Sequence, residues 1–83
     1  MNRVLIMLYV PALEKVYDVW IPAHRRVHSI IKLLVKAVNE LNDGSFVTNG
    51  MPLLYNKMTG NPYDINLTIK ETDIRSGTEV VLI

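Results

Sequence analysis

Two segments near the start of the chain are rich in apolar residues and predict β-strands. Residues 3–10, RVLIMLYV, are apolar almost without alternation, which is typical of a central strand or of one covered on both faces. In residues 15–21, KVYDVWI, alternate side chains fall on opposite faces. One face holds Tyr17, Val19 and Ile21, and the other holds Val16, Asp18 and Trp20. Because Pro11 cannot continue a central strand, we expect residues 11–14 to form the turn of a β-hairpin.

The apolar spacing changes at about Arg26 and becomes that of an amphipathic α-helix. The apolar stripe consists of Val27, Ile30, Leu34, Val38 and Leu41, widened by Ile31 and Val35. Polar and charged residues (Lys32, Lys36, Asn39, Glu40) cover the far side. The helix is expected to end at the segment Asn42-Asp43-Gly44, where glycine can adopt the left-handed conformation.

The second half of the chain predicts shorter elements. Residues 45–51 are expected to form a loop, residues 52–56 a strand, residues 58–61 a turn and residues 61–64 a short edge strand that tolerates Pro62. Thr68 and Glu71 have the spacing of a capping box, which predicts one helical turn. Ile74 is then expected to be buried, with a tight turn at Ser76-Gly77 and a last strand over residues 78–83.

This order of elements predicts a single α+β domain over residues 1–83. One main helix would pack on one face of a mixed sheet of four to five strands. A short helical turn precedes the last strand, which is expected to lie beside the first.

Composition and charge narrow the classes of function. The nine basic and eight acidic residues are well mixed and give a net charge of +1, so no clustered basic surface for nucleic acid is indicated. The chain has no cysteine, which excludes thiolate catalysis, disulfides and zinc–sulfur sites. Pro11 interrupts the first apolar run, and the apolar helical run carries Lys32 and Lys36, so we expect a cytoplasmic protein without direct membrane insertion.

The final segment, TIKETDIRSGTEVVLI, resembles the corresponding part of ubiquitin. The matching features are a capped turn, an isoleucine, a glycine turn and an alternating strand, here Thr68, Ile69, Ile74, Gly77 and the pair Val80 and Leu82. The order of elements over nearly the whole chain resembles the same fold, the β-grasp. The resemblance implies a ubiquitin-like domain with the helix held against the sheet.

A narrower resemblance, to the small bacterial YukD/EsaB family, rests on the second strand and the start of the helix. It is carried by Tyr17-Asp18, Val19, Ile21-Pro22-Ala23, Val27 and Ile30-Ile31, and by the turn Met58 to Gly60. That family implies a cytoplasmic accessory component of type VII (WXG100) secretion systems, with a larger protein of the secretion apparatus as partner. Most of these residues are structural, so the resemblance supports the fold more firmly than the function.

Ubiquitin-like modifiers and sulfur carriers act through a flexible tail that ends in Gly-Gly. This sequence has no glycine after Gly77, and Val80 and Leu82 are expected to be core residues. Activation of the terminal carboxylate is therefore the disfavoured alternative, although a longer precursor would restore it. A general ubiquitin-like interaction module is the other alternative.

The face of the sheet opposite the helix is the main candidate site. If Val19, Ile21, Val80 and Leu82 point toward the helix, other residues of these strands point outward. The predicted protein-binding residues are Trp20, Leu54, Val81 and Ile83, together with Leu13. A contiguous exposed apolar patch of this kind marks an interaction site. Docking on a partner protein, homodimerisation through this face and coverage by loops are the three interpretations.

The segment HRRVH offers two weaker candidates. His24 and His28 have a spacing that could chelate a metal on a helix, but His24 is expected to precede the helix and no third ligand is evident, so no metal is predicted. Arg25 and Arg26 lie where the helix dipole disfavours cations, and the two interpretations are a solvated corner and contact with an acidic partner. No nucleophile with a matching base and no phosphate-binding loop is evident, so we expect neither an enzyme nor a cofactor.

Overall fold

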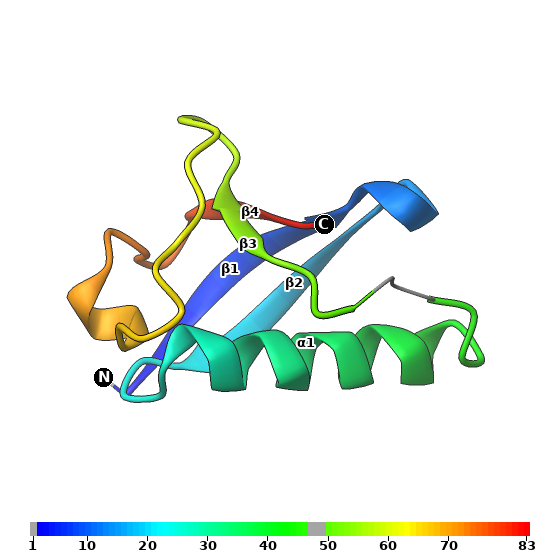
Figure 1. Cartoon of the computed structure of the whole chain (residues 1–83), viewed down its shortest axis with the longest axis horizontal. Helices are drawn as coiled ribbons and strands as arrows, with labels where there is room; N and C mark the ends of the chain where they lie inside the picture. Colours follow the sequence, from blue (N-terminus) through cyan, green and yellow to red (C-terminus); the bar gives the residue numbers. More distant parts are fainter. Residues whose placement is uncertain (1, 47–49) are drawn as a thin grey trace.

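The computed structural model describes residues 2–46 and 50–83. Within them it contains four strands, β1 (Arg3–Val10), β2 (Lys15–Pro22), β3 (Leu54–Asn56) and β4 (Glu79–Leu82), and one α-helix, α1 (Val27–Leu41). Two single-turn 3-10 helices, η1 (Pro11–Leu13) and η2 (Ile69–Glu71), complete the fold. Figure 1 shows α1 lying along one face of the twisted sheet, as the sequence predicted. Part of the expected loop, Val47 to Asn49, lies outside the described residues.

The sheet is mixed and its strand order is β2-β1-β4-β3. β1 and β2 form the predicted hairpin, with unbroken antiparallel register from Arg3 opposite Pro22 to Val10 opposite Lys15. β4 lies parallel to β1, as expected, and β3 pairs antiparallel with β4. Residues 61–64 do not form a fifth strand, because their backbone pairing with β3 is limited to an isolated bridge between Tyr55 and Pro62. The pairing ends after Tyr63 because the chain turns at Asp64, whose carboxylate accepts from the amide of Asn66 at 2.9 Å.

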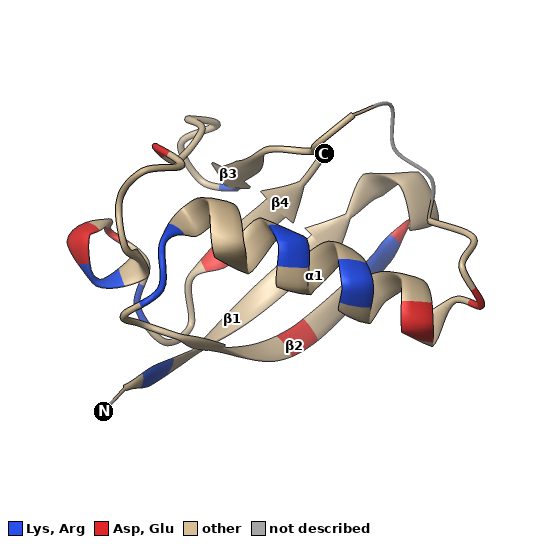
Figure 2. Ribbon diagram, turned by 60° about the horizontal axis from the view of Figure 1, so that its bottom comes forward, with Lys and Arg blue, Asp and Glu red and all other residues tan. Residues whose placement is uncertain are grey.

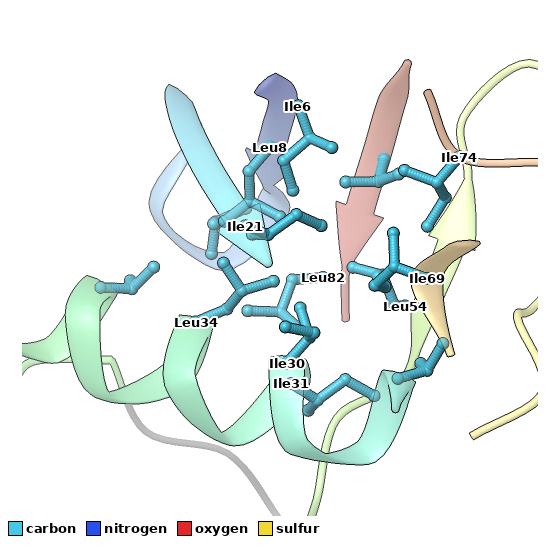
Figure 3. Close-up of a cluster of buried hydrophobic side chains, with 14 of the residues drawn as sticks. Ile6, Leu8, Ile21, Ile30, Ile31, Leu34, Leu54, Ile69, Ile74 and Leu82 are labelled. Carbon is cyan, nitrogen blue, oxygen red and sulfur yellow. The ribbon is translucent and has the colours of Figure 1, made fainter. Parts of the chain in front are cut away.

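The core lies between the sheet and α1 and consists of aliphatic side chains with one phenylalanine, Phe46. Figure 3 shows these side chains converging from the strands, from α1 and from the segments around Ile69 and Ile74. The burial of Ile21, Val80, Leu82 and Ile74 confirms the inward orientation predicted for them. No polar side chain is buried among the described residues.

The predicted apolar stripe of the helix is confirmed except at its last member. Val27, Ile30, Leu34 and Val38 are buried, whereas Leu41 is 67% exposed. Leu41 is the last residue of α1. At this end of the helix it is the side chain of the next residue, Asn42, that points toward the sheet. The Asn42 side-chain nitrogen donates to the Tyr17 hydroxyl at 2.8 Å and to the Val38 carbonyl at 2.8 Å.

The first turn of α1 is capped by a distant part of the chain. The amide of Val27 donates to the carbonyl of Leu67 at 2.8 Å, and that of His28 donates to the carbonyl of Ile65 at 3.1 Å. The next two amides, of residues 29 and 30, both donate to the carbonyl of Arg26. Because the first amides of a helix lack partners within it, the bonds to residues 65 and 67 satisfy donors that the helix itself leaves open.

The capping box predicted at Thr68 and Glu71 is present and begins η2. The Glu71 carboxylate accepts from the Thr68 amide at 2.9 Å and from its hydroxyl at 3.0 Å. These two bonds, with the nearby charges of Arg26 and Lys70, hold the pKa of Glu71 below its usual value. Gly77 has a φ of 95°, which confirms the tight turn predicted before β4.

A hydrogen-bonded group built around Tyr63 joins the end of β3 to the segment after η2. The Tyr63 hydroxyl donates to the Asp73 carboxylate at 2.7 Å and accepts from the Asn56 side-chain nitrogen at 3.0 Å. Burial and the bond to Asp73 raise the pKa of Tyr63 to about 12. The neutral phenol is therefore favoured in the folded state.

This shift predicts a loss of stability at high pH. A folded-state pKa above the unfolded value of about 10 means that stability is fully present below pH 10 and is lost as the pH rises toward 12. In Tyr63→Phe this contribution is absent, so its free energy of unfolding should fall less steeply between pH 10 and pH 12. Urea titrations of both proteins at several pH values measure the difference, and parallel curves would contradict the assignment.

Candidate functional site

The face of the sheet opposite α1 carries mostly apolar and aromatic side chains with a few charged ones, and we call it the outer sheet face. Successive side chains of a strand point to opposite faces of the sheet. The residues next to a buried strand residue therefore belong to the outer sheet face. From β2 and β1 they are Val16, Asp18, Trp20, Leu5, Met7 and Tyr9. From β4, β3 and their ends they are Glu79, Val81, Ile83, Leu53, Tyr55 and Lys57.

Three of the predicted binding residues do point outward. Trp20 is 51% exposed and Ile83 is 62% exposed. Val81 is half-buried and lies between its neighbours Tyr9 on β1 and Tyr55 on β3. Their orientation agrees with the prediction, while their role in binding stays a prediction.

Leu54 was wrongly predicted to lie on this face. Its side chain is fully buried and it pairs with Leu82, which also points into the core. The strand residues that face outward are its two neighbours, Leu53 and Tyr55. A shift of one residue exchanges the two faces of a strand, and this is the error in the sequence-based assignment.

The register also separates Trp20 from Val81. Trp20 lies opposite Leu5, whereas Val81 lies beside Tyr9, four residues farther along β1. Since a strand rises about 3.3 Å per residue, the two positions are about 13 Å apart along the strand direction. Between them, Met7 has Asp18 on one side and Glu79 on the other. The apolar surface is therefore two groups joined by a narrow strip along β1.

The larger group surrounds a shallow hollow of about 320 Å³, which we call the apolar hollow. It is lined by Tyr55, Asn56, Lys57, Gly60, Val81 and Ile83. The ammonium group of Lys57 lies 5.5 Å from the centre of the Tyr9 ring, in a cation–π contact. At the other end, the Arg3 guanidinium lies 5.5 Å from the Trp20 ring. The arrangement can accept an apolar side chain beside a positive charge.

Leu13 lies in η1, between the two strands of the hairpin, and is only half-buried. Its side chain packs against the core cluster. It contributes to the core from the turn, away from the strand positions that form the outer sheet face.

The two arginines just before α1 have different surroundings. Arg25 is exposed, whereas the guanidinium of Arg26 donates to the carbonyl of Asn66 and helps to hold that loop. Arg26 therefore has a structural role that the sequence did not indicate. His24 lies in the turn before α1, as expected, and no cluster of three or more His, Cys, Asp or Glu side chains suited to a metal occurs in residues 2–46 and 50–83.

Sequence reasoning missed Tyr9, Tyr55, Lys57 and Leu53 as members of the site. The signal was present for Tyr9, because β1 was expected to be apolar on both faces. For the residues around β3, the assignment required the pairing of β3 with β4, which joins distant parts of the chain.

The sequence matches no family model and no curated protein. Solved structures do match, and they share the ubiquitin-like β-grasp fold over the whole chain. The EccD5 ubiquitin-like domain from Mycobacterium xenopi superposes with a TM-score of 0.81 at 21% identity and covers 100% of this chain and 94% of its own. The ubiquitin-like domain of the Mycobacterium tuberculosis type VII secretion system protein EccD1 gives 0.79 at 14% identity, covering 100% and 99%.

A further match is a chain of the MycP5-free ESX-5 inner membrane complex. It gives a TM-score of 0.82 at 19% identity and covers 100% of this chain. This chain spans only 21% of the length of that protein. Within the described part of the present chain, no helix is long and apolar enough to cross a membrane.

Proposed function

We propose that this chain is a non-catalytic ubiquitin-like docking domain that binds a larger protein of a type VII secretion apparatus on its cytoplasmic side. The observation that carries the proposal is the outer sheet face, where Tyr55, Val81 and Ile83 line the apolar hollow. Figure 1 shows α1 on the opposite face of the sheet. Exposed apolar surface of this kind is typical of protein interaction sites.

Two likenesses support the assignment of this chain to a secretion system, one in structure and one in sequence. The ubiquitin-like domains of EccD5 and EccD1 match over the full chain, and the segments Tyr17-Asp18 and Ile21-Pro22-Ala23 resemble the YukD/EsaB family. Because identities of 14% to 21% establish the fold alone, the assignment to secretion is an inference from these likenesses.

The mechanism is surface recognition. An apolar side chain of the partner would enter the apolar hollow, and the charges of Lys57 and Glu79 beside it would orient the partner. The two described groups with shifted pKa values, Tyr63 and Glu71, are not among the residues that line the apolar hollow. The face itself needs no reactive group for this role.

Affinity capture from the native host tests the proposal with two matched variants. Ile83→Asp places a carboxylate at the rim of the apolar hollow, while Leu41→Asp places one on an equally exposed leucine at the end of α1. We expect type VII secretion components to be enriched by the wild-type chain and by Leu41→Asp, and at least about tenfold less by Ile83→Asp. Mass spectrometry quantifies the captured proteins.

Two results would overturn the proposal. Equal capture by Ile83→Asp would show that the outer sheet face is not the docking site, and capture without secretion components would remove the assignment to that apparatus. Sedimentation analysis of the purified chain addresses a homodimer through the same face. A dimer that Ile83→Asp dissociates would assign the face to self-association.

A further inference from the structure

A second hollow lies on a different part of the molecule, beside α1, and its charge differs from that of the outer sheet face. It has a volume of about 260 Å³, and we call it the lysine hollow. Its lining consists of Lys32, Val35, Lys36, Gly50, Met51 and Pro52. The helix supplies one wall, and the segment that leads into β3 supplies the other.

Lys32 and Lys36 are one helical turn apart and form the charged rim of this hollow. Figure 2 shows two neighbouring basic positions along α1, and both lysines are exposed. Neither has a hydrogen-bond or ion-pair partner in the described chain. Like charges four residues apart destabilise a helix slightly, so the pair does not serve the stability of α1.

Few acidic groups of the helix itself neutralise these lysines. The helix neighbours of Lys32 at three and four positions are His28, Ser29, Val35 and Lys36. The first turn of α1 contains no acidic residue, and Glu40 lies one turn beyond Lys36. The rim is therefore positive along most of its length.

The floor of the lysine hollow is apolar and suits one side chain. Val35 is half-buried, Pro52 is buried and Met51 is 58% exposed. Pockets for small organic ligands usually measure about 300–1,000 Å³, so this hollow is below that range. Its size and lining fit a single apolar side chain of a peptide segment.

We propose that the lysine hollow docks an acidic peptide segment that carries one apolar anchor residue. The anchor occupies the floor between Val35 and Met51, and carboxylates on either side of it pair with Lys32 and Lys36. A lipid surface fits less well, because recognition of anionic membranes normally uses about 4–8 basic residues in a cluster. The inference is independent of the outer sheet face, since the two hollows share no lining residue.

Nuclear magnetic resonance with a synthetic probe tests this proposal. The probe is a short blocked peptide with glutamates on both sides of a single leucine, added to the ¹⁵N-labelled chain at low salt. We expect amide shifts at residues 32–36 and 50–53, with binding weakened by added salt. Replacing the leucine of the probe with serine, or its glutamates with lysines, should abolish these shifts.

A pair of charge-reversed variants supplies the matched control. Lys32→Glu/Lys36→Glu should weaken binding of the probe by at least about tenfold, because two attractive charge contacts become repulsive. Lys15→Glu/Lys70→Glu changes the net charge by the same amount at exposed positions outside the lysine hollow and should bind normally.

Three outcomes would overturn the inference. The first is no shift in the lysine hollow, and the second is equal weakening in both double variants, which would indicate unspecific attraction. The third is binding of vesicles rich in anionic lipid that only Lys32→Glu/Lys36→Glu abolishes, without binding of the peptide. That result would assign the surface to a membrane.

Discussion

Replacing Leu54 with alanine is expected to lower the free energy of unfolding by about 2–5 kcal/mol. Leu54 is fully buried, opposite Leu82 and within the core between the sheet and α1. Truncation would leave a cavity that the packed strands can only partly close. In a domain of this size, each kcal/mol shifts the melting temperature by about 4–8 °C. Urea and thermal unfolding followed by circular dichroism measure both quantities.

The neighbouring leucine is the control for this prediction. Leu53 is 40% exposed on the outer sheet face, so Leu53→Ala should cost less than about 1 kcal/mol. The two variants remove the same atoms from adjacent positions, and their difference therefore measures which face each side chain occupies. Equal losses, or a larger loss at Leu53, would contradict the register between β3 and β4.

Replacing Asn42 with alanine is expected to cost about 2–3 kcal/mol, because its side chain makes three hydrogen bonds. Its nitrogen donates to the Tyr17 hydroxyl and to the Val38 carbonyl, each at 2.8 Å. Its oxygen accepts from the Lys15 ammonium group at 2.7 Å. The bonds to Tyr17 and Lys15 connect the end of α1 to β2. Urea denaturation of Asn42→Ala measures the loss.

A double-mutant cycle with Tyr17→Phe separates the contact with β2 from the rest. We expect a coupling energy of about 0.5–1.5 kcal/mol between the two positions, since the shared hydrogen bond is lost only once. Asn61→Ala, at an exposed position in the turn after β3, should change stability by less than about 0.5 kcal/mol. Additive losses at Asn42 and Tyr17 would show that this bond contributes nothing.

The elements that the sequence predicted well are those with a local signal. The alternation in residues 15–21 sets which side chains of β2 point outward, and the helical spacing from Val27 onward identifies α1. The capping box at Thr68 and Glu71 is local too, because its members lie three residues apart. Each of these patterns is complete within one segment of the chain.

The errors occurred where the outcome depends on pairing between distant segments. Residues 52–54 read Pro-Leu-Leu, so hydrophobicity alone does not indicate which leucine is buried. The pairing with β4 determines which leucine is buried, because Leu82, which points into the core, lies opposite Leu54. The separation of Trp20 from Val81 has the same origin, since it depends on the offset of β2 and β4 along β1. Likewise, the loop contact of Arg26 depends on Asn66, far along the chain.

The capping of α1 by the carbonyls of Ile65 and Leu67 has a consequence for how the domain folds. Helix ends commonly fray, because their outer amides have no partner within the helix. Here the amides of Val27 and His28 are held by a segment that follows β3 in the chain. The first turn of α1 is therefore completed only when the later part of the chain has docked. We therefore expect the amides at the start of α1 to exchange with solvent only when the segment before η2 detaches from the helix.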